Sequence, residues 1–189
     1  MKVAILHEGN SKKTNDNGLI KLLLEDLNLD ENRVEFFGFG PKSNFYKTDY
    51  IKYKNLKLGI EEESINKILF ILDADKEEND NTYGGLEKTK LELEKVIAEL
   101  GLADLSNIYV TCDPKTQDGY LESLILSSIP IKHKECIETF LECSEFKSKE
   151  NHKSILNQIY KRAYPNVPFD LSHPNFDALK EKLHNLFNK

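Results

Sequence analysis

The sequence predicts an α/β fold with a mainly parallel four-stranded sheet, and two short segments carry most of this prediction. Residues 2–9 and 68–75 each begin with an apolar run that stops abruptly at carboxylates. This pattern is typical of a parallel strand that is covered on both faces, because polar residues are excluded until the chain leaves the sheet. Segments with helical periodicity alternate with the strands, which favours parallel strand–helix–strand units.

The amino-terminal part of the chain has the pattern of one such unit. We expect strands at residues 2–7 and 33–38, and a helix at about residues 16–28 between them. One side of this helix is apolar and is formed by Leu19, Ile20, Leu23, Leu24 and Leu27. The crossover that joins the two strands should be right-handed, as in nearly all parallel units of this kind.

The middle of the chain supplies a third strand and a long amphipathic helix. After a polar, aromatic stretch at residues 41–57, we expect a short helix at about 60–66 and a strand at 67–72. The next helix, at about residues 84–100, ends at Gly101. Its apolar face comprises Leu86, Leu93, Val96, Ile97 and Leu100.

The rest of the sequence predicts one more strand, followed only by helices. The strand is expected at residues 107–112, with a turn at 113–119 after it. Beyond the turn, helical patterns with breaks between them occupy about residues 120–128, 132–145, 151–162 and 175–187. We therefore expect an α/β domain at residues 1–128 and a helical extension at 129–189 that packs on the same domain.

Carboxylates follow the first and the third of these strands. Glu8 comes directly after the first strand, whereas Asp73 and Asp75 stand at the end of the third. Open α/β sheets place their ligands at the carboxyl ends of the strands, so these three side chains are expected to converge. Converging carboxylates repel one another unless a cation lies between them, and Mg²⁺ or Mn²⁺ prefers hard oxygen ligands. The sequence thus predicts a metal site at this edge of the sheet.

The two acidic motifs resemble those of a known family. Glu8-Gly9 after the first strand and Asp73-Ala-Asp75 after the third are similar to the two signatures of the Toprim fold. That domain is shared by topoisomerases, bacterial primases, overcoming-lysogenization-defect nucleases and small nucleases that mature ribosomal RNA. The resemblance covers about residues 1–125. It departs from the family at Lys12, where many members have an acidic residue, and after Asp75, where many have glycine.

The resemblance implies roles for the acidic residues. Asp73 and Asp75 are similar to metal ligands of the family, and Glu8 to a ligand or a general acid/base. Metal ions held in this way neutralise a phosphate, polarise the scissile bond and make a bound water more acidic. The resemblance therefore implies phosphoryl-transfer chemistry that uses Mg²⁺ or Mn²⁺.

A second acidic pair follows the fourth strand. If the helix there begins at Asp118, the spacing of four places the carboxylates of Asp118 and Glu122 on one face near the same crevice, where they would hold a second metal ion. Lys115, in the same turn, is a candidate for stabilising a developing oxyanion. The alternative is that Asp118 caps the helix and Glu122 is solvated.

A basic and aromatic run is the candidate surface for nucleic acid. Its lysines can meet phosphates while its rings stack on bases, as in many single-strand binding sites. The run comprises Lys42, Lys47, Lys52, Lys54 and Lys57 with Phe45, Tyr46, Tyr50 and Tyr53. The alternative is a lysine-rich surface segment whose rings pack on the sheet. Lys12 and Lys13 lie beside Glu8-Gly9 and are candidates for contacts with the scissile phosphate.

Composition narrows the classes of protein. The chain has 189 residues, 39% of them hydrophobic, which is enough for one core and a small appendage. The longest apolar runs are shorter than the roughly 18 residues that a membrane span needs, so we expect a cytoplasmic protein without membrane contact. Three cysteines without a CxxC pair indicate neither a disulfide framework nor a zinc site. The net charge of −6 argues against a general nucleic-acid coat protein but is compatible with an enzyme that meets phosphate through metal ions.

Three functions are compatible with these patterns. The favoured one is a Mg²⁺- or Mn²⁺-dependent nuclease that acts on DNA or RNA. The second is a non-catalytic Toprim-like module that binds nucleic acid, a protein partner or a second copy of itself. The third, a phosphatase of the haloacid dehalogenase type, fits less well, because its Asp-x-Asp motif ends the first strand and has threonine or valine where this chain has Glu77.

Overall fold

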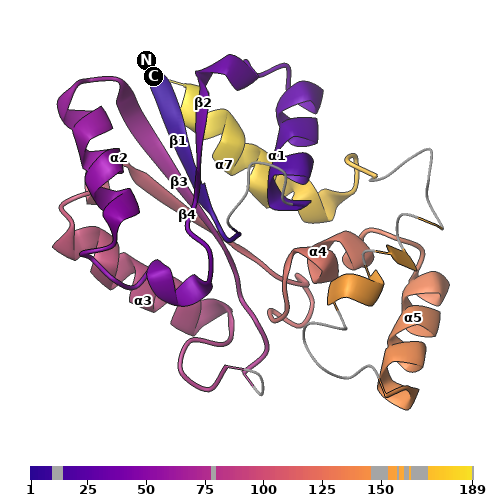
Figure 1. Cartoon of the computed structure of the whole chain (residues 1–189). Coiled ribbons are helices and arrows are strands. Elements are labelled where there is room, and N and C mark those ends of the chain that lie inside the picture. Colours follow the sequence, from indigo (N-terminus) through magenta and orange to yellow (C-terminus); the bar gives the residue numbers. More distant parts are fainter. Residues whose placement is uncertain are drawn as a thin grey trace.

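The computed structural model describes residues 1–9, 15–77, 80–145, 153–156, 158–159, 162 and 170–188. In this part of the chain, four strands form one sheet in the order β2-β1-β3-β4, and every neighbouring pair is parallel. The strands are β1 (Lys2–His7), β2 (Val34–Gly38), β3 (Ile65–Asp73) and β4 (Ser106–Thr111). The predicted α/β class with a parallel four-stranded sheet is confirmed, and the arrangement is consistent with a Toprim-like fold (Figure 1).

Helices cover both faces of the sheet (Figure 1). One face packs against α1 (Asn15–Asp26), α4 (Leu121–Ser127) and α7 (Asp177–Phe187). The other packs against α2 (Ile51–Glu61) and α3 (Leu86–Glu99). A further helix, α5 (Ile131–Cys143), follows α4, and short 3₁₀ turns occur at Glu31–Arg33, Lys42–Asn44, Ala103–Leu105 and Pro174–Phe176.

The alternation of side chains along the central strands divides the core into two layers. Successive residues of a strand point to opposite faces, so each central strand must be apolar at consecutive positions. The layer on the α1 and α7 side includes Val3, Ile5, Leu69 and Ile71. The layer on the α2 and α3 side includes Ala4, Leu6, Phe70 and Leu72. Because Leu179, Leu183 and Leu186 of α7 join the first layer, the carboxyl-terminal helix belongs to the same core as β1.

The predicted short helix at about residues 60–66 is wrong. The helix in this region is α2, at Ile51–Glu61, and Ile65 already belongs to β3. Its inward side is Tyr53 and Leu56, whose spacing of three places both on one face against the sheet. Of the lysines in this helix, Lys54 is exposed and Lys52 and Lys57 are half-buried, and their density gives the segment the sequence pattern of a polar loop.

The remaining boundaries lie close to the predicted ones. The first helix ends at Asp26 instead of residue 28, and the fourth strand begins and ends one residue earlier than expected. The last helix begins at Asp177 after a 3₁₀ turn at Pro174–Phe176. The predicted helix at residues 151–162 lies partly outside the described residues. Within this range, residues 153–156 are described and helical.

The strand order creates a switch point between β1 and β3. From β1 the chain crosses to β2 on one side of it and then returns to β3 on the other side. Adjacent crossovers that leave in opposite directions open a crevice at the carboxyl ends of the two strands. Glu8 follows β1 and Asp73 ends β3, so both stand at this crevice.

Two further properties concern membrane-spanning helices and the state of the cysteines. None of the helices in the described ranges is both long and apolar enough to cross a membrane. Cys112 is buried, Cys136 and Cys143 are exposed, and all three are free thiols.

Truncation of Leu183 tests whether α7 belongs to the main core. This side chain is fully buried, so Leu183→Ala should lower the free energy of unfolding by about 2–5 kcal/mol. Leu58→Ala, the same change at a site that is 54% exposed, should alter it by about 0.5 kcal/mol or less. Urea denaturation followed by circular dichroism measures both. Equal effects of the two substitutions would contradict the packing described for α7.

Candidate active site at the carboxyl edge of the sheet

Glu8 and Asp73 are joined directly at the switch point. The Glu8 carboxylate accepts a hydrogen bond from the backbone N–H of Asp73, with 2.8 Å between Oε1 and the nitrogen. The residue before Glu8 is the buried His7, whose ring bonds to the Glu8 carbonyl oxygen at 2.7 Å. Burial lowers the pKa of His7. The acidic side chain is therefore fixed against the end of the neighbouring strand.

The Asp73 carboxylate is held on both of its oxygens. Oδ1 accepts hydrogen bonds from the Thr111 hydroxyl at 2.6 Å and from the backbone N–H of Leu121 at 3.0 Å. Oδ2 forms an ion pair with the ammonium group of Lys153. Thr111 ends β4 and Leu121 begins α4, so three segments that are distant in sequence fix the orientation of one carboxylate.

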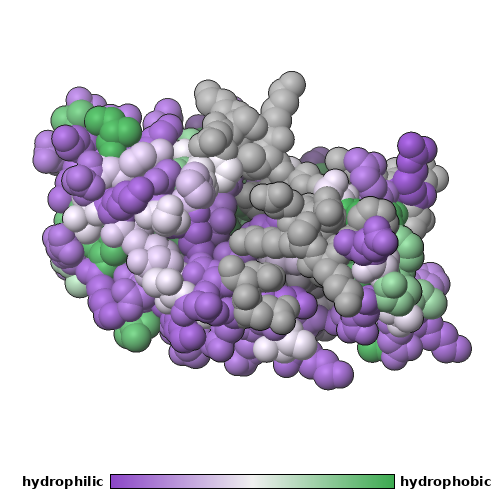
Figure 2. All heavy atoms as spheres, turned by 60° about the horizontal axis from the view of Figure 1, so that its bottom comes forward, coloured by the Kyte–Doolittle hydropathy of each residue, from purple (hydrophilic) through white to green (hydrophobic). Residues whose placement is uncertain are grey.

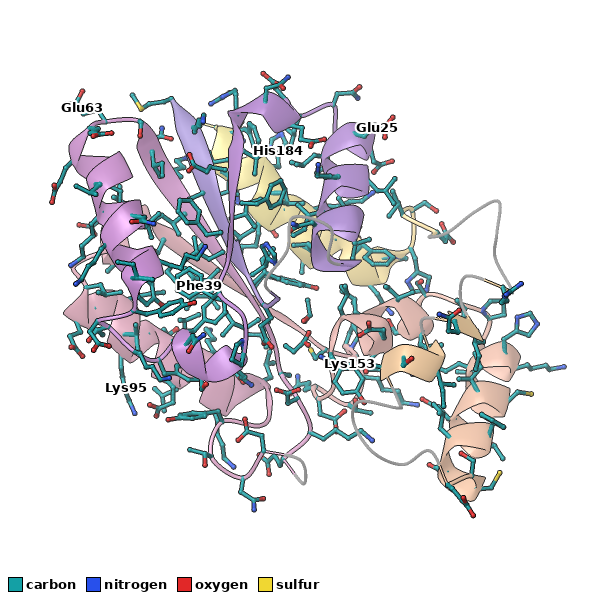
Figure 3. The ribbon with its side chains drawn as sticks, in the orientation of Figure 1. Glu25, Phe39, Glu63, Lys95, Lys153 and His184 are labelled. Carbon is teal, nitrogen blue, oxygen red and sulfur yellow. The ribbon has the colours of Figure 1, made fainter. Side chains whose placement is uncertain are left out.

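Lys153 reaches the site from the carboxyl-terminal part of the chain. Figure 3 labels it beside α4, near the ends of the strands. Its ammonium nitrogen lies 4.6 Å from the centre of the Tyr120 ring, a cation–π contact. Burial by itself lowers the pKa of Lys153, but the Asp73 carboxylate outweighs this effect and the pKa is raised. Lys153 is thus a cation placed at the oxygen that a metal ion would use.

Asp75 is set back from Asp73 in a constrained conformation. Its φ of 59° lies in the left-handed region, which costs a residue other than glycine roughly 1–2 kcal/mol. Backbone hydrogen bonds stabilise this turn, since the N–H of Asp75 donates to the Gly119 carbonyl at 2.6 Å and Gly119 returns a bond at 3.3 Å. The carboxylate is buried, and its Oδ2 lies 3.6 Å from the ammonium nitrogen of Lys42.

Lys42 holds the acidic loop from the opposite side. Its ammonium group donates to the carbonyl oxygens of Ala74 at 2.9 Å and Tyr83 at 3.0 Å, and to the Thr89 hydroxyl at 2.7 Å. Burial lowers the pKa of Lys42, and the charge of Asp75 opposes this shift. These contacts tie the loop after β2 to the loop after β3 and to α3.

The loop that follows Asp75 returns close to its own start. Gly85, with a φ of 90°, donates its N–H to the carbonyl oxygens of Ala74 at 2.9 Å and Asp75 at 3.3 Å. Gly84 must lack a side chain, because a Cβ atom there would lie 2.4 Å from the Asp80 carbonyl oxygen. The two glycines therefore allow the loop to close directly under the aspartates.

The pKa of Glu8 is shifted by its burial and by the two neighbouring carboxylates. Burial, together with the nearby charges of Asp73 and Asp75, raises the pKa of Glu8 to about 8, although the Asp73 N–H and Lys153 oppose the shift. The carboxylates predicted to converge are therefore close enough to interact electrostatically. A raised carboxyl pKa in a crevice is typical of functional sites, although structural charge networks produce it as well.

The donor set suits a hard divalent cation. Carboxylate oxygens are the ligands that Mg²⁺ and Mn²⁺ prefer, and a cation would relieve the repulsion that raises the pKa of Glu8. Within the described ranges, no three His, Cys, Asp or Glu side chains have the mutual geometry of a metal site. Lys153 lies on Asp73 and Lys42 on Asp75, so the carboxylates are spread toward two ammonium groups.

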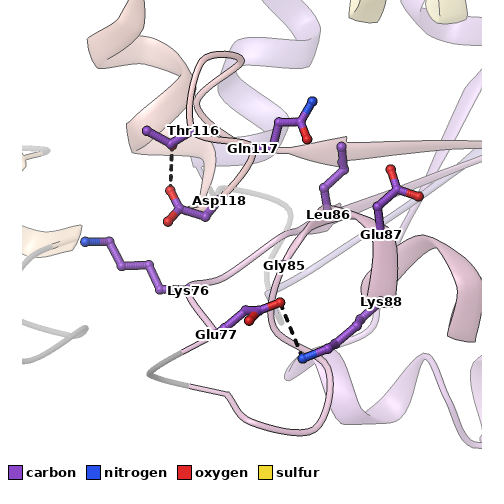
Figure 4. A pocket seen from close by; sticks show the side chains of 9 residues that line it. All are labelled: Lys76, Glu77, Gly85, Leu86, Glu87, Lys88, Thr116, Gln117 and Asp118. Carbon is purple, nitrogen blue, oxygen red and sulfur yellow. Dashed lines mark hydrogen bonds and ion pairs between the residues drawn. The ribbon is translucent and has the colours of Figure 1, made fainter.

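The predicted second acidic pair does not join this arrangement as a unit. Asp118 accepts a hydrogen bond from the Thr116 hydroxyl at 2.6 Å and lines a hollow of about 740 Å³ between the loop after β3 and the turn after β4 (Figure 4). Lys76, Glu77 and Lys88 line the same hollow. The helix begins only at Leu121, so Asp118 lies outside it and the spacing of four has no helical meaning.

Glu122 and Lys115 differ in their exposure to solvent. Glu122, in the first turn of α4, is half-buried and contributes to the electrostatic environment of Lys153. Lys115 is exposed, and its backbone N–H donates to Asp113 at 2.8 Å. The lysine that pairs with Asp73 is Lys153.

The basic and aromatic run is divided between surface and core. Lys47 and Lys54 are exposed and Lys52 is half-buried, so these three remain candidates for phosphate contacts. The rings of Phe45 and Tyr53 are buried and pack against Phe39, the ring labelled beside the sheet in Figure 3. These two rings belong to the core and are not placed to stack on bases. Lys12 and Lys13 lie outside the described residues.

The surface toward which the strands end is mainly polar. In the view of Figure 2, hydrophilic residues predominate over the part of this face that is not grey. Comparisons of the chain with models of protein families, with curated proteins and with solved structures find no match.

The raised pKa of Glu8 predicts a pH-dependent stability in metal-free protein. Between its ordinary value of 4.5 and about 8, native Glu8 holds a proton that the unfolded chain has lost, so the free energy of unfolding falls as the pH rises. From pH 7 to pH 8, where His7 is mostly neutral in both the native and the unfolded state, we expect a loss on the order of 1 kcal/mol.

Urea denaturation in the presence of a chelator measures this loss. Glu8→Gln keeps the hydrogen bond to the Asp73 N–H but cannot titrate, so its stability should stay level over the same range. A parallel decline in the wild type and in this variant would assign the pH dependence to other groups.

Proposed function

We propose that the protein is a Mg²⁺- or Mn²⁺-dependent phosphodiesterase that cleaves nucleic acid. The observation that carries the proposal is the hydrogen bond from the Asp73 backbone to the Glu8 carboxylate at the switch point, where burial and the nearby carboxylates together raise the pKa of Glu8. A divalent cation would reduce the repulsion between carboxylates in a crevice, and hydrolysis of phosphodiesters is one of the reactions that such cations assist. The resemblance of the two acidic motifs to the Toprim signatures favours the same chemistry.

Glu8 and Asp73 would hold the cation, and Asp75 would add negative charge behind them. A bound divalent cation would neutralise the phosphate and make a coordinated water more acidic. Thr111 and the Leu121 N–H orient the Asp73 carboxylate, so that one oxygen is kept for binding. As a ligand of the cation Glu8 would be held ionised, because a divalent cation opposes the burial and the neighbouring charges that raise its pKa in metal-free protein.

Lys153 supplies the charge that a phosphate needs. Its ammonium group pairs with Asp73 Oδ2, and because the side chain is 29% exposed the group can move from the carboxylate to a substrate oxygen. An ammonium group aimed at a phosphoryl oxygen stabilises the negative charge that develops there. In this proposal Lys153 takes the role expected of Lys115, and Lys47, Lys52 and Lys54 would contact more distant phosphates.

A non-catalytic binding module is the second candidate, and one observation favours it. Asp73 and Asp75 each have a lysine partner, so much of their charge is balanced without metal. A protein that binds nucleic acid or a protein partner without catalysing a reaction would not need a metal ion to replace the lysines in these two ion pairs. Metal binding therefore separates the two candidates.

Asp73→Asn tests the metal-dependent activity. The change keeps the size of the side chain but removes its charge, so Mn²⁺ affinity should fall by more than about a hundredfold, and cleavage should be lost. Calorimetry and cleavage assays with single- and double-stranded DNA and RNA measure the two effects. Asp26→Asn is the matched control, because Asp26 is an aspartate with a lysine partner, Lys180, on the surface. If Asp73→Asn cleaves any substrate as fast as the wild type, the proposed site is not the catalytic one.

Lys153→Met should change binding and turnover in opposite directions. Removing the competing ammonium from Asp73 should tighten Mn²⁺ binding several-fold. Cleavage at saturating Mn²⁺ should nevertheless slow by about a hundredfold, because the charge that stabilises the phosphate is lost. Lys180→Met is the control, since Lys180 pairs with Asp26 on the surface. Weaker metal binding, or unchanged turnover, in Lys153→Met would contradict this role.

A further inference from the structure

The two aspartates differ in how firmly their lysine partners are held. The side chain of Lys153 is 29% exposed and pairs with an Asp73 carboxylate that is 8% exposed. The side chain of Lys42 is 7% exposed and pairs with an Asp75 carboxylate that is 2% exposed. One ammonium group can leave toward solvent, whereas the other is enclosed.

Lys42 is fixed by neutral groups as well as by charge. A lysine ammonium has three hydrogen atoms to donate, and at Lys42 they meet the Ala74 carbonyl, the Tyr83 carbonyl and the Thr89 hydroxyl at 2.7–3.0 Å. The Thr89 hydroxyl in turn donates to the Tyr83 carbonyl at 2.8 Å, which orients its oxygen toward Lys42. The ammonium group therefore keeps its place even when the charge of Asp75 is removed.

We propose that Lys42 is the permanent counter-ion of Asp75 and that it restricts the acidic cluster to a single divalent cation, bound by Glu8 and Asp73. This inference rests on the proposed function and specifies its metal stoichiometry. A cation bound to Asp75 would lie within a few ångströms of a fixed ammonium group, and the low dielectric of a buried site would strengthen their repulsion. Asp75 then acts through its charge and through Lys42 on the loop, as a positioning residue.

The geometry of the strand edge explains why only one side of the cluster is open. Asp73 is held by Thr111, Leu121 and Lys153, which belong to β4 and to the helices that follow it. Asp75 meets Lys42, which follows β2 and reaches α3. The ammonium group that can leave, that of Lys153, is therefore on the β4 side of the cluster. The ammonium group that stays, that of Lys42, is on the α3 side.

Titration calorimetry of the full chain with Mn²⁺ alone tests the stoichiometry. The wild type should bind one Mn²⁺ per chain. Lys42→Met removes the fixed charge and should open Asp75 to a second Mn²⁺, a gain that a merely structural role of Lys42 would not produce. The second site should disappear again in Lys42→Met combined with Asp75→Asn. Lys134→Met, at another partly buried lysine–aspartate pair, should leave the stoichiometry at one.

Asp75→Asn tests the same point in a variant that preserves the backbone. Asparagine tolerates the left-handed conformation of residue 75 better than most residues, and Lys42 keeps its three neutral acceptors. Asp75→Asn should still saturate with one Mn²⁺, with an affinity lowered by about tenfold, whereas Asp73→Asn should not saturate.

Each other outcome is decisive. Two Mn²⁺ in the wild type, one in Lys42→Met, or loss of binding in Asp75→Asn equal to that in Asp73→Asn would overturn this inference while leaving a metal-dependent function in place. No Mn²⁺ in the wild type would overturn the proposed function and this inference together.

Discussion

The hydrogen bond from the Asp73 backbone to the Glu8 carboxylate is the contact on which the arrangement of the site depends. It joins the ends of the two central strands at the place where the chain turns away from β1 on one side and from β3 on the other. The contacts with Thr111, Leu121 and Lys153 start from Asp73, and the contact with Lys42 starts from Asp75. A carboxylate that bonds to its neighbour's backbone cannot relax away from the other carboxylates, so their repulsion is built into the fold.

The sheet also separates the partners of the two aspartates. Asp73 is the last residue of β3, and its carboxylate meets α4 and Lys153. The left-handed turn at Asp75 directs the next carboxylate to Lys42, whose loop is attached to α3. Two aspartates separated by one residue thereby acquire unlike surroundings, one partly open and one enclosed. Differences of this kind allow chemically identical side chains to take different roles.

The strands and the position of Glu8 beside Asp73 at one edge of the sheet were predictable, because a doubly covered strand must be apolar and must end where its polar residues begin. The start of α2 was not, since its two buried side chains, Tyr53 and Leu56, stand among exposed and half-buried lysines. Asp118 was misplaced relative to α4 because the chain first makes an antiparallel bridge between Gly119 and Asp75, which delays the helix to Leu121.

The two lysines at the site show where sequence patterns have no information. Lys42 carried a usable signal, because it follows β2 at the same edge of the sheet as the acidic residues, although it was grouped with the surface lysines. Lys153 carried none, since it is 80 residues from its partner Asp73 and belongs to a helical segment with no acidic motif. Ion pairs between distant segments depend on packing, which a local pattern does not specify.

The two ends of the loop after Asp75 are held together, so the acidic site does not depend on the length of the loop between them. Gly85 bonds back to Ala74 and Asp75, and Lys42 binds Ala74 and Tyr83 across the same junction. The chain thus leaves and re-enters the body of the protein at two adjacent fixed points. Extra residues placed after Thr82 would lengthen the excursion without moving its anchors, at an entropic cost of only about 0.6 kcal/mol for each doubling of length. The junction is therefore a natural graft point, at which a foreign peptide or a small reporter domain can be carried beside the acidic cluster.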